Sequence, residues 1–132
     1  MSRFVRTARS ATVVFGIAAV LSACGGAISS SEPGGSLPPG ALAVEAKEYS
    51  FTPSALSAPA GPVTFSVTNA GNENHEFEVM RGDQSLGKIP PFSRGTTQAV
   101  TVSVEPGTYE FVCRLNGHDQ LGMTGTLTVT GR

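Results

Sequence analysis

Hydrophobic and polar residues alternate along most of residues 42–130, and this period of two constrains the fold more than any other feature. In VTFSVTN (63–69), the valine and phenylalanine side chains fall on one face and the hydroxyl side chains on the other. The remaining segments that predict strands are 42–51, 75–80, 96–105, 108–113 and 124–130. None of these segments carries a helical apolar face. The pattern therefore predicts an all-β domain.

Turn-forming residues separate the predicted strands at short intervals, which favours a Greek-key β-sandwich or barrel of about 6–8 strands. In the segment TYEFVC we expect Tyr109, Phe111 and Cys113 to point into the core. The sequence GKIPPFSRG (87–95) is rich in proline and glycine, and we predict that it is a connection rather than a strand.

The N-terminal segment predicts an exported lipoprotein. Three arginines precede an apolar run at 11–21 that is too short to span a bilayer, as in a signal peptide. The sequence LSAC (21–24) resembles the lipobox of bacterial lipoproteins, in which the cysteine is acylated through sulfur and becomes the new N-terminus. We predict that residues 1–23 are a lipoprotein signal peptide and that Cys24 carries a lipid. The resemblance implies a protein anchored to the membrane on its extracytoplasmic side.

Glycine, serine, proline and alanine fill nearly all of residues 25–41, GGAISSSEPGGSLPPGA. Such a composition buries too little apolar surface to offset the entropy lost on ordering. We therefore predict that residues 24–41 form the lipidated cysteine and a flexible linker, and that residues 42–132 form the single folded domain.

Side chains that bind soft metals gather in one short segment, CRLNGHDQLGM (113–123). The chain has two cysteines, two histidines and three methionines, and one of each lies here, at Cys113, His118 and Met123. This segment joins the last two predicted strands, so a rigid scaffold would hold it. The other histidine, His75, opens an earlier strand and can face the same end of the domain.

Two imidazoles, one thiolate and one thioether match a known ligand set, because a trigonal His₂Cys site with a weak axial Met is the blue-copper electron-transfer site. Thiolate and thioether favour Cu(I), whereas imidazole also suits Cu(II), so the mixed set accepts both oxidation states. We expect one copper ion and reversible one-electron transfer. A second copper centre would need further imidazoles, and the chain has no other histidine.

The order of these residues resembles a cupredoxin of the plastocyanin and azurin type. An upstream NHEF supplies the first histidine, and the Cys-x₄-His-x₄-Met loop is followed by GTLTV. The resemblance implies that His75, Cys113 and His118 are the strong metal ligands and Met123 the axial one. It also implies that the ring edge of His118 faces solvent and serves as the electron port, within an apolar patch formed by Leu115, Gly117, Leu121 and Gly122.

Two positions depart from the family pattern. Members often carry a small polar residue after the first histidine, where it ties the two ligand loops together, but here Glu76 follows His75 and Asn74 precedes it. Arg114 follows the cysteine, where smaller residues are more usual. An arginine near the copper would favour Cu(I), and one facing solvent would be available to a partner. We name Asn74 and Arg114 as candidate supporting residues beside the ligands.

The same residues permit other interpretations. Cys113 can be a buried free thiol that packs as a small hydrophobe. Cys113, His118 and Asp119 superficially resemble a nucleophilic dyad with an orienting acid, although no oxyanion hole is evident. Two histidines and a cysteine can also hold zinc, which leaves Met123 without a role.

We expect an electron carrier rather than an enzyme, acting as a monomer with redox proteins as partners and the membrane as its anchor point. The alternative is an exported protein that binds, buffers or delivers copper without an electron-transfer role. Nucleic acid is not an expected partner, because nine Lys and Arg residues are balanced by ten Asp and Glu residues and are scattered along the chain.

Overall fold

The computed structural model describes residues 37–131. The predicted signal peptide (1–23), the predicted lipidation site Cys24 and residues 25–36 of the predicted linker lie outside this range. Among the described residues, no helix has the length and apolar character needed to cross a membrane.

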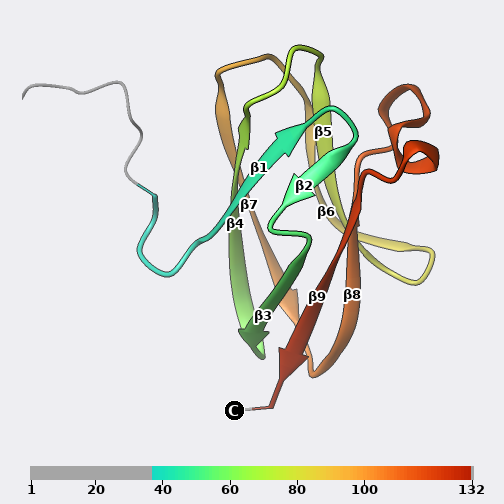
Figure 1. Ribbon diagram of the computed structural model, residues 1–132. Coiled ribbons are helices and arrows are strands. Elements are labelled where there is room, and N and C mark those ends of the chain that lie inside the picture. Colours follow the sequence, from blue (N-terminus) through green and yellow to red (C-terminus); the bar gives the residue numbers. More distant parts are fainter. Residues whose placement is uncertain (1–36, 132) are drawn as a thin grey trace, which may run out of the picture. The chain divides into compact units, whose positions relative to one another are not determined.

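Two β-sheets contain nearly all the regular structure of residues 37–131 (Figure 1). The nine strands are β1 (Leu42–Lys47), β2 (Ser50–Thr52), β3 (Ala55–Pro59), β4 (Gly61–Asn69), β5 (His75–Arg81), β6 (Gln84–Phe92), β7 (Thr97–Val104), β8 (Gly107–Val112) and β9 (Thr124–Thr130). A 3₁₀ helix, η1 (Leu115–Leu121), lies between β8 and β9. The predicted all-β sandwich is confirmed, with more strands than the sequence pattern indicated.

The strands form one four-stranded and one five-stranded sheet. One sheet has the order β2-β1-β4-β7 and the other the order β3-β9-β8-β5-β6. Most neighbours are antiparallel, whereas β1 pairs with β4 and β3 with β9 in parallel. The predicted first strand, 42–51, divides into β1 and β2 at Glu48 and Tyr49, and Tyr49 has a left-handed backbone with φ of 57°.

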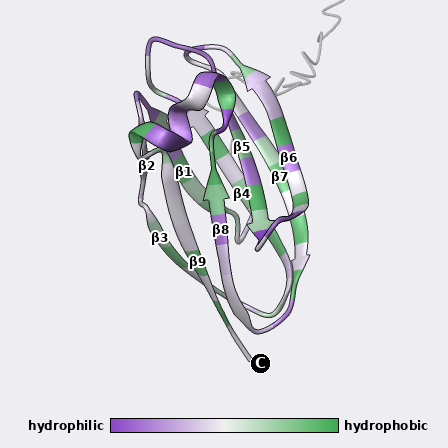
Figure 2. Cartoon of the chain, turned by 90° about the vertical axis from the view of Figure 1, so that its right-hand side faces the viewer, coloured by the Kyte–Doolittle hydropathy of each residue, from purple (hydrophilic) through white to green (hydrophobic). Residues whose placement is uncertain are grey.

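Aromatic side chains from both sheets form the centre of the core. The ring of Phe77 in β5 lies 5.1 Å from Phe65, 5.3 Å from Phe111 and 5.4 Å from Phe51, measured between centroids. All four residues are at most 3% exposed. Figure 2 shows hydrophobic and hydrophilic residues alternating along the strands, which is the pattern that directs these side chains inward. The predicted inward orientation of Tyr109, Phe111 and Cys113 is confirmed by their burial.

The prediction that residues 87–95 form a connection is wrong, because most of them belong to β6. Pro90 and Pro91 have no backbone N–H to donate, which excludes them from most central strands. β6 lies at the edge of its sheet, with β5 as its one neighbour there. An edge strand leaves half of its N–H groups unpaired, so it tolerates both prolines.

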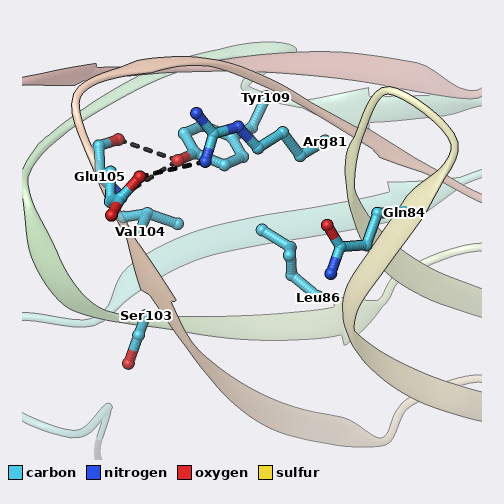
Figure 3. Close-up of a pocket in the computed structure, with 7 residues that line it drawn as sticks. All are labelled: Arg81, Gln84, Leu86, Ser103, Val104, Glu105 and Tyr109. Atoms are coloured by element: carbon cyan, nitrogen blue, oxygen red, sulfur yellow. Dashed lines mark hydrogen bonds and ion pairs between the residues drawn. The ribbon is translucent and has the colours of Figure 1, made fainter.

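The end of the sandwich remote from His75 is closed by a tyrosine corner. The hydroxyl group of Tyr109 donates to the carbonyl oxygen of Glu105 at 2.9 Å and accepts from its N–H at 3.0 Å. Arg81, the last residue of β5, pairs with the Glu105 carboxylate at 3.2 Å and lies over the Tyr109 ring. These residues line a pocket of about 340 Å³ (Figure 3), together with Gln84, Leu86, Ser103 and Val104.

Gly125 in β9 provides a test of the sheet packing. A methyl group at this position would lie 2.8 Å from the carbonyl oxygen of Ser54 and would overlap the ring of Phe111. We expect Gly125→Ala to lower the free energy of unfolding by roughly 1–3 kcal/mol, the usual cost of overpacking, measured by urea denaturation of the metal-free protein. Gly131→Ala is the matched control, because its added methyl group meets nothing within 4 Å. Equal midpoints for the two variants would contradict this packing.

Candidate metal centre

The predicted ligands come from two segments that the sheet brings together. His75 is the first residue of β5, and Cys113 directly follows the last residue of β8. β5 and β8 are antiparallel neighbours, with Glu78 opposite Val112, so the start of one strand lies beside the end of the other. Met123 directly precedes β9. The site therefore lies at the end of the sandwich that carries η1 (Figure 1).

The loop between β8 and β9 is tightly structured. Asn116 and Gly117 adopt left-handed backbones with φ of 53° and 77°, which turn the chain within η1. Asparagine and glycine are the residues that best tolerate this conformation. The N–H of Cys113 donates to the carbonyl oxygen of Met123 at 3.1 Å, and the N–H of Met123 donates to that of His118 at 3.0 Å. These backbone bonds fix the spacing of the three loop residues.

Three of the four predicted ligands form one compact cluster. One donor atom from each of His75, Cys113 and His118 lies within 4.8 Å of the other two. The Cys113 sulfur is 3.5 Å from Nδ1 of His118. Both histidines are at most 2% exposed, and Cys113 and Met123 are fully buried. Neither ring nitrogen of His75 has a hydrogen-bond partner, so a buried polar ring faces the cluster unsatisfied.

Burial changes the protonation of the cluster. Desolvation, followed by the neighbouring His118, lowers the pKa of His75, which leaves its imidazole neutral and able to bind a metal. Desolvation raises the pKa of the Cys113 thiol, so its proton must leave when a metal binds. A catalytic cysteine needs the opposite, an accessible thiolate of low pKa. The environment of Cys113 therefore disfavours a nucleophilic role and fits a metal ligand.

Comparison with known protein families decides the class. The cupredoxin-like domain family matches residues 16–129, which is most of the chain. The chain belongs to this family. Its buried His-Cys-His cluster fits copper binding, because the unsatisfied imidazole of His75, the Cys113 sulfur and the His118 imidazole are the donors that copper accepts in a cupredoxin.

Solved structures of blue copper proteins share the fold of this cupredoxin. Auracyanin from the photosynthetic bacterium Roseiflexus castenholzii superposes with a TM-score of 0.65 and 17% identity, covering 69% of this chain and 97% of that protein. Auracyanin B gives a TM-score of 0.65 and 24% identity over 72% of this chain and 91% of the other. Auracyanin A from Chloroflexus aurantiacus, described as a "blue" copper protein, gives 0.58 and 21% identity over 69% of this chain and all of that one.

A curated relative comes from a metal-uptake system. The iron uptake system component EfeO of Yersinia pestis is 35% identical over 78 residues, which is 59% of this chain and 20% of EfeO. The aligned segment therefore corresponds to about a fifth of the length of that relative. The similarity thus covers one short part of a much longer protein.

The prediction that the ring edge of His118 faces solvent is wrong for this cupredoxin, because the residue is only 2% exposed. Its Nε2 lies 3.2 Å from the carboxylate of Glu73, which belongs to the turn between β4 and β5. The ring of Tyr49 meets the imidazole edge-on, with centroids 5.0 Å apart. In the expected apolar patch, Leu121 is 60% exposed and Leu115 is partly buried. Residues from two turns thus cover the ring.

Glu76 links the two segments that carry the predicted ligands. Its backbone N–H donates to the Cys113 sulfur at 3.4 Å, and its carboxylate accepts the N–H of Arg114 at 3.2 Å. Its second oxygen lies 3.0 Å from the Lys88 ammonium, and its side chain is only 6% exposed. The side chain of Arg114 is exposed, and so is Asn74. The connecting role that the family gives to a small polar residue is therefore filled here by a carboxylate.

Removing the Glu76 carboxylate should weaken this connection. In Glu76→Ala the N–H of Arg114 and the Lys88 ammonium lose a buried acceptor, and we expect the free energy of unfolding to fall by about 1–3 kcal/mol. Glu76→Gln keeps an acceptor for Arg114, so its loss should be smaller. Urea denaturation of the metal-free protein measures both losses. Glu110→Ala, at an exposed position of β8, is the control, and a Glu76→Ala midpoint no lower than that of the control would refute the link.

The sequence did not indicate that Glu48 and Glu73 lie beside the candidate ligands. Glu48 accepts the backbone N–H of Asn72 and, at 2.9 Å, that of Glu73, and it lies 3.8 Å from Nε2 of His75. The hydrogen bonds from Glu73 and Asn72 lower the pKa of Glu48 to about 2, so its carboxylate is ionised at neutral pH. No motif marks either glutamate. Their positions depend on which turns meet, and that follows from the topology.

Proposed function

We propose that this cupredoxin binds one copper ion through His75, Cys113, His118 and Met123 and carries single electrons between redox proteins. One observation carries the proposal: donor atoms of two histidines and a cysteine lie within 4.8 Å, all buried, and the His75 ring nitrogens have no hydrogen-bond partner. A buried imidazole without a hydrogen-bond partner is costly, and a metal ion would satisfy it.

The arrangement of the chain supports electron transfer rather than substrate chemistry. The copper would supply the Cu(II)/Cu(I) couple. The paired strands and the backbone bonds of Met123 hold the donors in place, so they need move little when the charge of the metal changes. The complete burial of Cys113 and Met123 supports a closed site. A carrier needs this closed site, whereas a metalloenzyme needs an open one.

We further propose that the protein is exported and anchored to a membrane through lipid on Cys24. The sequence of residues 1–24 supports this part, and an exported protein would place Cys113 in an oxidising compartment. A tether near the membrane raises the effective concentration of the protein for redox partners held there. We expect the protein to act as a monomer.

A second candidate function is metal handling, in which the protein binds, buffers or delivers copper and its redox activity is incidental. The 35% identity to a component of an iron uptake system favours this candidate. The buried, closed cluster favours the electron carrier, because delivery requires ready release of the metal.

Copper titration tests the proposed function. Cu(II) added to the purified metal-free protein should produce an intense visible absorption from charge transfer between thiolate and copper, saturating at one equivalent. Zn(II) should give a colourless complex in a parallel titration. No absorption, or saturation at more than one equivalent, would refute the proposed site.

Exchange kinetics then separate the two candidate functions. A carrier should exchange electrons rapidly with small redox reagents and keep its copper in the presence of a competing chelator. A delivery protein should surrender its copper to that chelator on the timescale of mixing. Rapid copper loss would decide in favour of metal handling.

A further inference from the structure

The outer edge of His118 is covered by an acidic residue whose place in the fold is well defined. Nε2 of His118 lies 3.2 Å from a carboxylate oxygen of Glu73, while Nδ1 of the same ring lies 3.5 Å from the Cys113 sulfur. The imidazole thus has the cluster on one side and a carboxylate on the other. The Glu73 side chain is itself 50% exposed, whereas His118 is only 2% exposed.

The backbone of Glu73 is held by side chains from two other parts of the domain. Asn69, which is fully buried, donates its side-chain N–H to the carbonyl oxygens of Glu73 at 2.8 Å and Phe92 at 3.0 Å. Its side-chain oxygen accepts the N–H of Gly71 at 3.0 Å. Glu48, in the turn between β1 and β2, accepts the N–H of Glu73. This network fixes the turn that presents the carboxylate to His118.

We propose that Glu73 is a positioning residue of the copper site. Its carboxylate accepts the Nε2–H of His118, which fixes the tautomer that leaves the Nδ1 lone pair directed toward Cys113. The negative charge beside the ring makes the imidazole a stronger donor and favours Cu(II) over Cu(I). The same carboxylate shields the ring edge through which electrons would otherwise pass. The proposal rests on the copper-binding function proposed above.

The contact between Glu73 and His118 can be tested in the metal-free protein. Long-range ¹H–¹⁵N correlation spectra of the full-length metal-free protein, at mildly alkaline pH, should show His118 as the Nε2–H tautomer with a slowly exchanging ring proton. In Glu73→Ala we expect that proton to exchange about tenfold faster or more, because a hydrogen bond to a charged acceptor is lost. Glu105→Gln, at the opposite end of the domain, should behave like the unsubstituted protein. The Nδ1–H tautomer, or unchanged exchange in Glu73→Ala, would overturn the proposal.

The copper-loaded protein tests the electrostatic and shielding effects. Glu73→Gln keeps an acceptor but loses the charge, so its reduction potential should rise; in Glu73→Ala the potential should rise further. Electron exchange with a small redox reagent should also become faster in Glu73→Ala, as the ring edge is uncovered. Potentials and rates equal to those of Glu105→Gln would overturn the proposal while leaving copper binding intact. If the unsubstituted protein takes up no copper, the proposed function fails, and the spectra of the metal-free protein alone decide the contact.

Discussion

Cys113→Ser is expected to lose the intense visible absorption that Cu(II) produces in the unsubstituted protein. The serine hydroxyl is close in size to the thiol, but it stays protonated at neutral pH and is a poor ligand for a soft metal. The charge-transfer band requires a thiolate, so its loss should be complete rather than partial. Copper affinity should also fall steeply, because two imidazoles and a thioether remain. Optical titration with Cu(II) measures both effects.

Two controls make the result of Cys113→Ser decisive. Cys24→Ser removes the other cysteine of the chain, which lies in the predicted lipobox, and should leave the absorption unchanged. A cooperative urea transition of metal-free Cys113→Ser would show that the variant is folded and that the missing band reflects the missing ligand. Persistence of the band in Cys113→Ser would refute the assignment of this cysteine to the copper.

The alternation of side chains predicted the fold class because it records burial directly. Val63, Phe65 and Val67 follow one another on one face of β4, and all three are buried. The pattern failed at β6, where Pro90 and Pro91 mimic a loop. Whether proline is tolerated depends on whether the strand lies at the edge of its sheet, and that is decided by strands distant in the sequence. Local sequence cannot supply that information.

The sequence also predicts only part of the candidate site. Cys113, His118 and Met123 are close in sequence, and their spacing alone predicted that they share a loop. Only the pairing of β5 with β8 brings His75 to them. Glu48 lies in the turn between β1 and β2 and Glu73 in the turn between β4 and β5, and no motif marks either residue as part of the site. The sequence therefore predicts three candidate donors that the structure brings together, His75, Cys113 and His118, but it does not predict Glu48 and Glu73 beside them.

The core that supports the site should depend heavily on Phe77. This residue lies two positions after His75 in β5, and its ring contacts three other phenylalanines from both sheets. We expect Phe77→Ala to lower the free energy of unfolding of the metal-free protein by about 3–5 kcal/mol, through lost burial and the cavity left behind. Natural domains are stable by only about 5–15 kcal/mol, so the variant should sit close to its unfolding threshold. Urea denaturation measures the change.

A leucine at the surface provides the control for Phe77→Ala, because its substitution removes a large apolar side chain that is not part of the core. Leu121 is 60% exposed at the end of η1, and Leu121→Ala should change the free energy of unfolding by less than about 0.5 kcal/mol. Copper should raise the midpoint of Phe77→Ala, because a ligand that binds only the folded state stabilises it by mass action. This rescue would show that the folded state of Phe77→Ala still binds copper. A Phe77→Ala midpoint equal to that of Leu121→Ala would mean that the aromatic cluster does not stabilise the sandwich.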